Sequence, residues 1–267
     1  MTPSTPKTYL LFAKDAPVGV VFYRKSRLTT YCLHYDYESK GNGFRCKLTR
    51  GSRFYGRIFP ERCDLSPDGA LMVYFAMRGM KTAGSADPST WSAVCTPPWL
   101  KAHLFFPNNS TWGGGGVFLR DRRLVVFDSP PKAAGPEYSR FRGYEIVRDT
   151  KALPVSEIDI LKRRFQPPAV IKTPCPVGAG RKPRPVLVKT LKPDHLGDYD
   201  RFDYVLQDTS GNDVEGVEEI VLANWAGWDN FGRLVVVAGR CLKIYDVEAG
   251  RRLEKPVKVL DLEDVLP

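Results

Sequence analysis

A glycine run is the most unusual segment that could do chemistry. Trp112 is followed by Gly113, Gly114, Gly115 and Gly116, and consecutive backbone amides in such a loop can face an anion. No Lys-Ser or Lys-Thr pair follows, so the segment is not a P-loop, and it leads into an apolar strand rather than a helix. We favour the alternative interpretation, a tight turn where the backbone packs closely against Trp112.

A basic segment in the second half of the chain could bind phosphates. Residues 161–192 hold nine Lys or Arg and no acid, a pattern suited to a polyanion. The candidate residues are Lys162, Arg163, Arg164, Arg181, Lys182 and Arg184. Phe165 is the one aromatic residue close to them, so the stacking platform typical of single-strand binders is missing. A solvated surface, or an internal partner for the acidic residues 193–267, is the competing interpretation.

Other polar groups do not form a catalytic or metal-binding pattern. His34, His103 and His195 are distant from one another, and no sequence of the Walker, H-E-x-x-H or G-x-S-x-G type occurs. Acidic residues cluster at 194–203 and 213–219. Paired carboxylates can hydrolyse glycosides, but only at a defined separation that a sequence does not give. We therefore nominate no catalytic residue, metal ligand or cofactor, and favour a protein that is not an enzyme.

The cysteines and the hydropathy pattern indicate a cytoplasmic setting. The six cysteines form no C-x-x-C pair and are spaced too irregularly for a small disulfide scaffold. No signal-peptide core follows the N-terminus, and no run of apolar residues is long enough to span a bilayer. We expect free thiols, a reducing compartment and no contact with a membrane.

The elements that would position these residues are mostly strands. The chain has 22 Pro and 23 Gly, and short apolar runs alternate with turn signals. One example is Leu71–Ala76 after Ser66-Pro67-Asp68-Gly69. The last part of the chain predicts a meander with strands at Glu219–Leu222, Arg233–Ala238 and Cys241–Val247. Leu153–Phe165 is the one helix that the sequence predicts, and the Pro/Gly-rich residues 166–185 predict a long basic loop.

Two segments resemble blades of β-propellers. Asp64–Gly69 followed by an apolar strand resembles the turn of WD-repeat and TolB-like propellers. Arg240–Gly250 resembles the outer strand of a WD-repeat blade, with Tyr245-Asp246 where Trp-Asp is usual. The resemblance implies one propeller-like domain over residues 1–267, mostly all-β, with roughly five blades or a partial propeller. It also implies similarity to propeller-like proteins of bacteria. The regular spacing of about 40–45 residues that blades normally keep is broken by the long loops.

This fold favours a binding function. Rigid stacked sheets with exposed loops suit a non-catalytic scaffold, or a subunit of a bacterial multi-protein system, with a protein partner. Trp225 and Trp228 are candidate interface residues if their rings are exposed, and core residues otherwise. Nucleic-acid or polyanion binding through the basic loop and a carboxylate-based hydrolase remain the alternatives.

Overall fold

A computed structural model describes most of the chain. It covers residues 6–40, 43–78, 88–108, 110–111, 113–127, 138–148, 167–176, 185–192, 202–208, 210–214, 218–247 and 255–267. Strands dominate throughout these ranges, so the prediction of a mostly all-β chain is confirmed. No helix within these ranges is long and apolar enough to cross a membrane. The predicted helix at Leu153–Phe165 lies outside the described residues.

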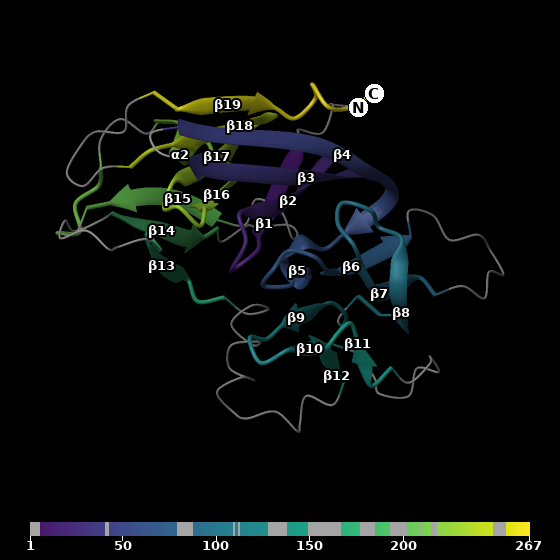
Figure 1. Ribbon diagram of the computed structural model, residues 1–267. Coiled ribbons are helices and arrows are strands. Elements are labelled where there is room, and N and C mark those ends of the chain that lie inside the picture. The colour runs from purple at the N-terminus through teal and green to yellow at the C-terminus, as the bar shows by residue number, and fades with distance from the viewer. Residues whose placement is uncertain are drawn as a thin grey trace.

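The strands form four sheets, which follow one another in chain order from purple to yellow in Figure 1. We divide the first, eight-stranded sheet into two units, which gives five units in all. Unit 1 contains β1 (Lys7–Phe12), β2 (Val18–Ser26), β3 (Thr29–Lys40) and β4 (Gly43–Ile58). Unit 2 contains β5 (Asp64–Leu65), β6 (Met72–Arg78), β7 (Thr90–Cys95) and β8 (Ala102–Asn108). Unit 3 contains β9 (Gly116–Phe118), β10 (Arg123–Val126), β11 (Arg140–Phe141) and β12 (Tyr144–Val147). Unit 4 contains β13 (Val170–Pro174), β14 (Val186–Leu191) and β15 (Phe202–Gln207), and unit 5 contains β16 (Trp225–Trp228), β17 (Leu234–Ala238), β18 (Cys241–Tyr245) and β19 (Lys258–Asp261).

The strand β4 links the first two units into one sheet. It pairs with β3 over most of its length, and its last residues, Gly56–Ile58, pair with β6. A bulge at Gly51 and Ser52, opposite Cys32, shifts the register within the stretch that pairs with β3. The short 3-10 helix η1 (Pro60–Arg62) then leads into β5, which also pairs with β6.

The same turn joins the first two strands in three units. In unit 2, Ser66 Oγ accepts the amide of Leu71, and Gly69 has a φ of 73°. In unit 5, Asp229 Oδ1 accepts the amides of Phe231 and Arg233, and Gly232 has a φ of 75°. In unit 3, the corresponding residue is Arg122, with a φ of 61°. This left-handed conformation is strained for a residue that has a side chain. The predicted turn at residues 66–69 is confirmed, and its recurrence marks an internal repeat.

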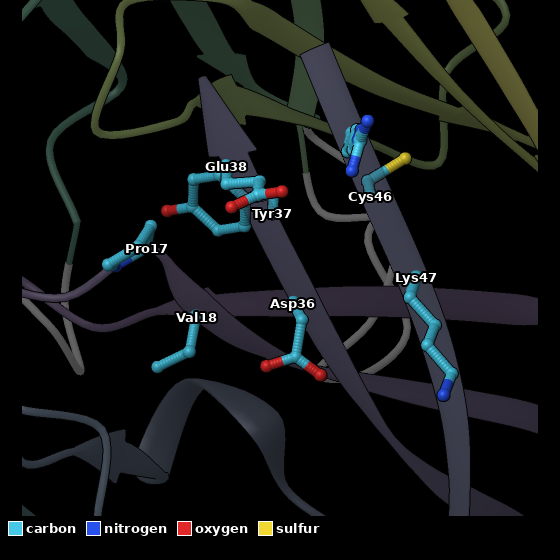
Figure 2. A pocket seen from close by; sticks show the side chains of 8 residues that line it. Pro17, Val18, Asp36, Tyr37, Glu38, Cys46 and Lys47 are labelled. Atoms are coloured by element: carbon cyan, nitrogen blue, oxygen red, sulfur yellow. The ribbon is translucent and has the colours of Figure 1, made fainter. Parts of the chain in front are cut away.

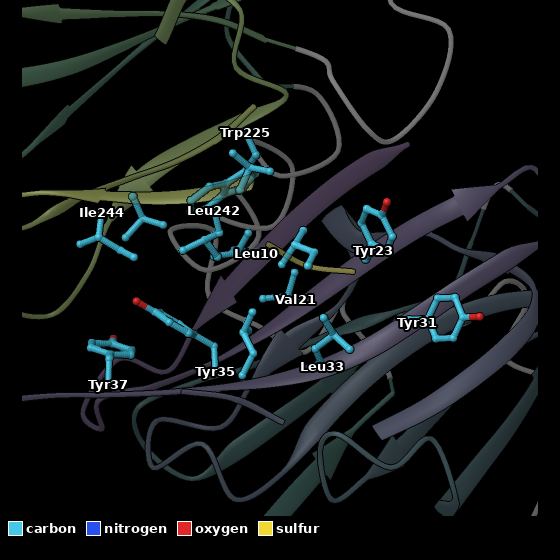
Figure 3. Close-up of a cluster of buried hydrophobic side chains, with 14 residues drawn as sticks. Leu10, Val21, Tyr23, Tyr31, Leu33, Tyr35, Tyr37, Trp225, Leu242 and Ile244 are labelled. Carbon is cyan, nitrogen blue, oxygen red and sulfur yellow. The ribbon is translucent and has the colours of Figure 1, made fainter. Parts of the chain in front are cut away.

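Apolar clusters join neighbouring units face to face. Figure 3 shows the cluster that packs Leu10, Val21 and Tyr35 of unit 1 against Trp225 and Leu242 of unit 5. The opposite face of unit 1 packs on unit 2, unit 2 packs on unit 3, and unit 4 packs on unit 5. Because successive side chains along a strand point to opposite faces of the sheet, one unit can contribute apolar residues to two clusters. The first and fifth units are therefore packed together although they lie at opposite ends of the chain.

Two local predictions need correction. Residues 166–185 were expected to form one loop, but strand β13 (Val170–Pro174) lies within them and pairs with β14. The predicted strand Glu219–Leu222 falls on the short helix α2 (Glu218–Val221). Ile220 and Ala223 are the buried residues there, and Val221 and Leu222 are exposed. Buried residues three positions apart are typical of a helix, whereas a strand would bury every second residue. The sequence shows only the apolar run, which fits both structures.

Candidate functional site

A groove of about 510 Å³ lies beside the hairpin formed by β3 and β4 (Figure 2). Its lining residues come from the turn after β1 and from the two hairpin strands: Pro17, Val18, Asp36, Tyr37, Glu38, Arg45, Cys46 and Lys47. Apolar side chains from the turn and charged side chains from the strands therefore meet in one hollow, which we call the hairpin groove.

Strand alternation places the charges of the hairpin groove on one face. Asp36 lies opposite Lys47, and Glu38 lies opposite Arg45, so opposite charges are cross-strand neighbours. Asp36 Oδ2 is also 3.0 Å from His34 Nδ1. The intervening tyrosines point the other way, into the cluster shared with unit 5. One face of the hairpin thus builds the core, and the other presents paired charges to solvent.

Aromatic rings and the Arg233 guanidinium, which donates to Ser39 Oγ at 2.9 Å, hold the hairpin in place. The Tyr37 ring stacks on Tyr35, with centroids 5.0 Å apart, and meets the edge of Phe231 at 5.9 Å. Arg233 Nε contacts Asp246 Oδ1 at 2.9 Å, and its guanidinium lies 4.3 Å above the Phe44 ring. Since Phe231 and Arg233 belong to the recurring turn of unit 5, that turn fixes the far end of the hairpin.

Lys189 is the second unusual feature, because it lies among units 2, 4 and 5. Its amine lies 5.9 Å from the ring centroids of both Tyr204 and Trp225, and it is only partly exposed. Burial lowers the pKa of Lys189 to about 8, and the carboxylate of Glu61 partly opposes this. Glu61 itself is buried. An amine with such a pKa is less costly to deprotonate than an ordinary lysine.

Three of the six cysteines are buried in the core. All six are free thiols. Cys32, Cys63 and Cys95 are buried in the cluster between units 1 and 2, and burial raises the pKa of Cys32 and Cys95. Within the described ranges, no three His, Cys, Asp or Glu residues are grouped so that they could hold a metal ion.

The glycine run packs closely against Arg62 and Phe75, whereas the predicted packing against Trp112 lies outside the described residues. Gly115 donates its amide to Ser92 Oγ at 2.7 Å, and Gly113 accepts from Arg62. An added Cβ at Gly114 would lie 2.2 Å from the Phe75 ring, and one at Gly115 would lie 2.2 Å from the Arg62 carbonyl oxygen. The backbone therefore packs against unit 2, with no space left for an anion. Trp112 is outside the described residues.

The candidate residues from the sequence are only partly placed. The six basic candidates, Lys162, Arg163, Arg164, Arg181, Lys182 and Arg184, all lie outside the described residues. The two tryptophans are buried, with 7% of Trp225 and 8% of Trp228 exposed. Trp228 Nε1 donates to the carbonyl of Thr173. Both rings belong to the core, so neither offers an exposed face to a partner.

A basic, aromatic surface along β4 was missed. Arg45, Lys47, Arg50 and Arg53 are exposed on this strand, which contains no acidic residue. Tyr55 follows them with 54% of its surface exposed. The sequence did contain a signal, because five bases and no acid occur between residues 43 and 58. The strand order was needed to recognise β4 as a partly unpaired edge.

Comparison with protein-family models, with curated proteins and with solved structures finds no match for this chain.

Proposed function

We propose that the five units are blades of a ring and that the chain is a non-catalytic module that binds a protein partner. The first strands of four units support the ring. Strand β1 contacts β16 on one side and β5 on the other, and β5 contacts β9. A row of neighbouring first strands is the arrangement expected around a propeller axis.

The recurring turns support the same ring. Asn230 of unit 5 donates to the carbonyls of Ala13 and Ala16 in unit 1, at 3.1 and 2.8 Å. The amide of Asp15 donates to the carbonyl of Pro67 in unit 2 at 2.8 Å. Lys14 reaches the carbonyl of Phe118 in unit 3. The turns of units 5, 1 and 2 therefore meet in order on one face.

Unit 4 would complete the ring between units 3 and 5. It packs on unit 5 through Leu187 and Tyr204. On the remaining face of unit 3, Val117 and Val125 are buried with Leu119, Phe127 and Val147, as expected if that face is covered. The charge of Glu61, in η1 before unit 2, raises the pKa of Lys189 in unit 4 against the effect of burial, as expected if the two residues face the middle of such a ring.

The hairpin groove carries the binding proposal. It combines apolar side chains with paired charges of both signs, a surface that suits a polypeptide better than a single-sign polyanion. A rigid framework supports it, because Arg233 of unit 5 contacts Ser39 and Phe44 at the end of the hairpin.

The test is affinity purification of the tagged full chain from its native host, with nuclease and at two salt concentrations. We expect a stoichiometric protein that survives both treatments. Its recovery should fall at least tenfold with Asp36→Lys, which places a second positive charge opposite Lys47. Asp264→Lys, an equal charge change at another exposed carboxylate, should leave recovery unchanged. Equal recovery with both variants would refute the hairpin groove as the binding surface.

A further inference from the structure

Strand β4 carries four exposed basic side chains and no acidic residue. Arg45 and Lys47 point to one face of the strand, and Arg50 and Arg53 point to the other. All four are exposed, and Arg45 and Lys47 lie opposite Glu38 and Asp36 on β3. Because the side chains are long, bases on both faces can reach a ligand that lies along the strand edge.

The edge itself is open over most of its length. Gly43–Tyr55 pair with β3 on one side, and no described strand pairs with the other side of this stretch. At about 3.3 Å per residue, these positions extend over roughly 40 Å. Charged side chains on an edge also prevent sheet-to-sheet aggregation, but that role does not require exposed aromatic rings.

Two exposed rings lie at the end of this basic edge. Tyr55 is on β4 itself, and Trp99 belongs to the loop between β7 and β8 and is 55% exposed. The loop is docked on β4 by two hydrogen bonds at Ser52: its amide donates to the Pro98 carbonyl at 3.1 Å, and its Oγ accepts the Leu100 amide at 2.9 Å. The Trp99 backbone is thus fixed next to Arg53 while its indole stays in solvent.

We propose that the β4 edge binds single-stranded nucleic acid. The phosphates contact Arg45, Lys47, Arg50 and Arg53, and bases stack on Trp99 and Tyr55. Basic side chains that follow an extended path, together with rings for stacking, are the two components that single-strand binders combine. The basic segment at residues 161–192 has the charge but lacks the rings. This inference does not require the hairpin groove to bind a protein, but Arg45 and Lys47 line both sites, so the two ligands would compete for them.

The charge count predicts the salt dependence. Four neutralised phosphates on a single strand give a slope of about −3 for the logarithm of affinity against the logarithm of salt concentration. Replacing two of the four arginine and lysine residues should reduce that slope by about half. Loss of a stacked base typically weakens binding by roughly 5- to 150-fold.

The experiment measures fluorescence anisotropy of a labelled 20-nucleotide oligo(dT) and an oligo(U) of equal length with the purified full chain. Trp99→Leu should weaken binding at least fivefold, whereas Trp99→Phe, which keeps a ring, should restore most of it. Arg50→Gln with Arg53→Gln should halve the salt slope. Lys172→Gln with Lys255→Gln is the matched control, because it removes two exposed charges that lie on β13 and before β19.

Three results would overturn the proposal. If the Trp99→Leu chain binds the oligonucleotide as tightly as the Lys172→Gln, Lys255→Gln control, the binding site does not lie on β4. The β4 variants could have no effect while the triple variant Arg181→Gln, Lys182→Gln, Arg184→Gln loses binding. The binding site would then lie on the basic loop. Displacement of the oligonucleotide by an equal concentration of poly-glutamate would show an acidic protein surface to be the ligand. The residues exchanged on β4 and at Trp99 are exposed, so unchanged circular dichroism is expected for every variant.

Discussion

Replacing Lys189 with methionine is expected to stabilise the folded chain at neutral pH. The amine lies between the rings of Tyr204 and Trp225, where a charge loses much of its hydration. Methionine keeps an unbranched chain of similar length and carries no charge. The substitution therefore removes the cost of holding an ammonium group in this position and retains most of the packing.

The expected gain in the free energy of unfolding follows from the pKa of Lys189. An ordinary lysine has a pKa of 10.5, and burial lowers that of Lys189 to about 8. The difference of about 2.5 corresponds to at most about 3.4 kcal/mol, since one pKa unit is worth about 1.4 kcal/mol. Lys189 keeps partial contact with water, which screens the charge, so we expect about 2 kcal/mol.

Because the pKa of Lys189 is lowered, the stability gained from its replacement should depend on pH, whereas a gain from better packing should not. The folded-state pKa lies below the unfolded value, so between about pH 8 and 10.5 the unfolded chain binds more protons. The stability of the natural chain should therefore rise through this window, while the Lys189→Met chain lacks that rise. Below about pH 8 the difference between the two chains should be constant.

Urea unfolding of both chains at pH 7 and pH 10, followed by circular dichroism, measures the difference. Methionine should add about 2 kcal/mol at pH 7 and less than about 1 kcal/mol at pH 10. Tyrosines titrate equally in both proteins and cancel in the comparison. Lys172→Met, at an exposed position on β13, is the control and should change little. A Lys189→Met chain that is less stable at pH 7, or a difference independent of pH, would refute the reasoning.

Three further predictions concern packing. Asn230→Ala removes the hydrogen bonds to the carbonyls of Ala13 and Ala16, so the free energy of unfolding should fall by about 1–3 kcal/mol in urea titrations; an unchanged value would show that the turns are held by other contacts. Gly115→Ala should lower the stability by about 3 kcal/mol or more, because the new Cβ would lie 2.2 Å from the Arg62 carbonyl oxygen, whereas Gly239→Ala, which has nothing within 4 Å, should cost about 1–2 kcal/mol. Thermal unfolding of the two alanine variants makes that comparison, and equal losses would contradict the close approach. Of the six free thiols, the buried Cys32, Cys63 and Cys95 should react with a thiol reagent only after unfolding in urea, and fast reaction of all six in the native protein would contradict their burial.

The strand content and the turns could be predicted from the sequence because both are local properties. Short apolar runs and the Ser66–Gly69 turn signal depend on neighbours within a few positions, and these predictions are confirmed. The α2 segment shows the limit of this approach, since a short apolar run does not distinguish a helical turn from a strand.

The surfaces could not be predicted, because they depend on which units pack together. Trp225 is buried by side chains from unit 1, more than 180 residues earlier in the chain. The β4 bases are spread over nine residues and become one surface only because the strand lies at an edge. The loop that presents Trp99 reaches β4 through Pro98, a contact that no local pattern indicates.

The packing of unit 1 on unit 5 has a consequence for biosynthesis. Tyr35 and Leu10 leave the ribosome early, but Leu242 and Ile244, which cover them, follow about 200 residues later. At 5–20 residues per second, that interval is about 10–40 s. During this time the apolar face of the first hairpins has no native cover, so a nascent chain stalled before unit 5 would present a surface that trigger-type chaperones recognise and that favours association between neighbouring nascent chains.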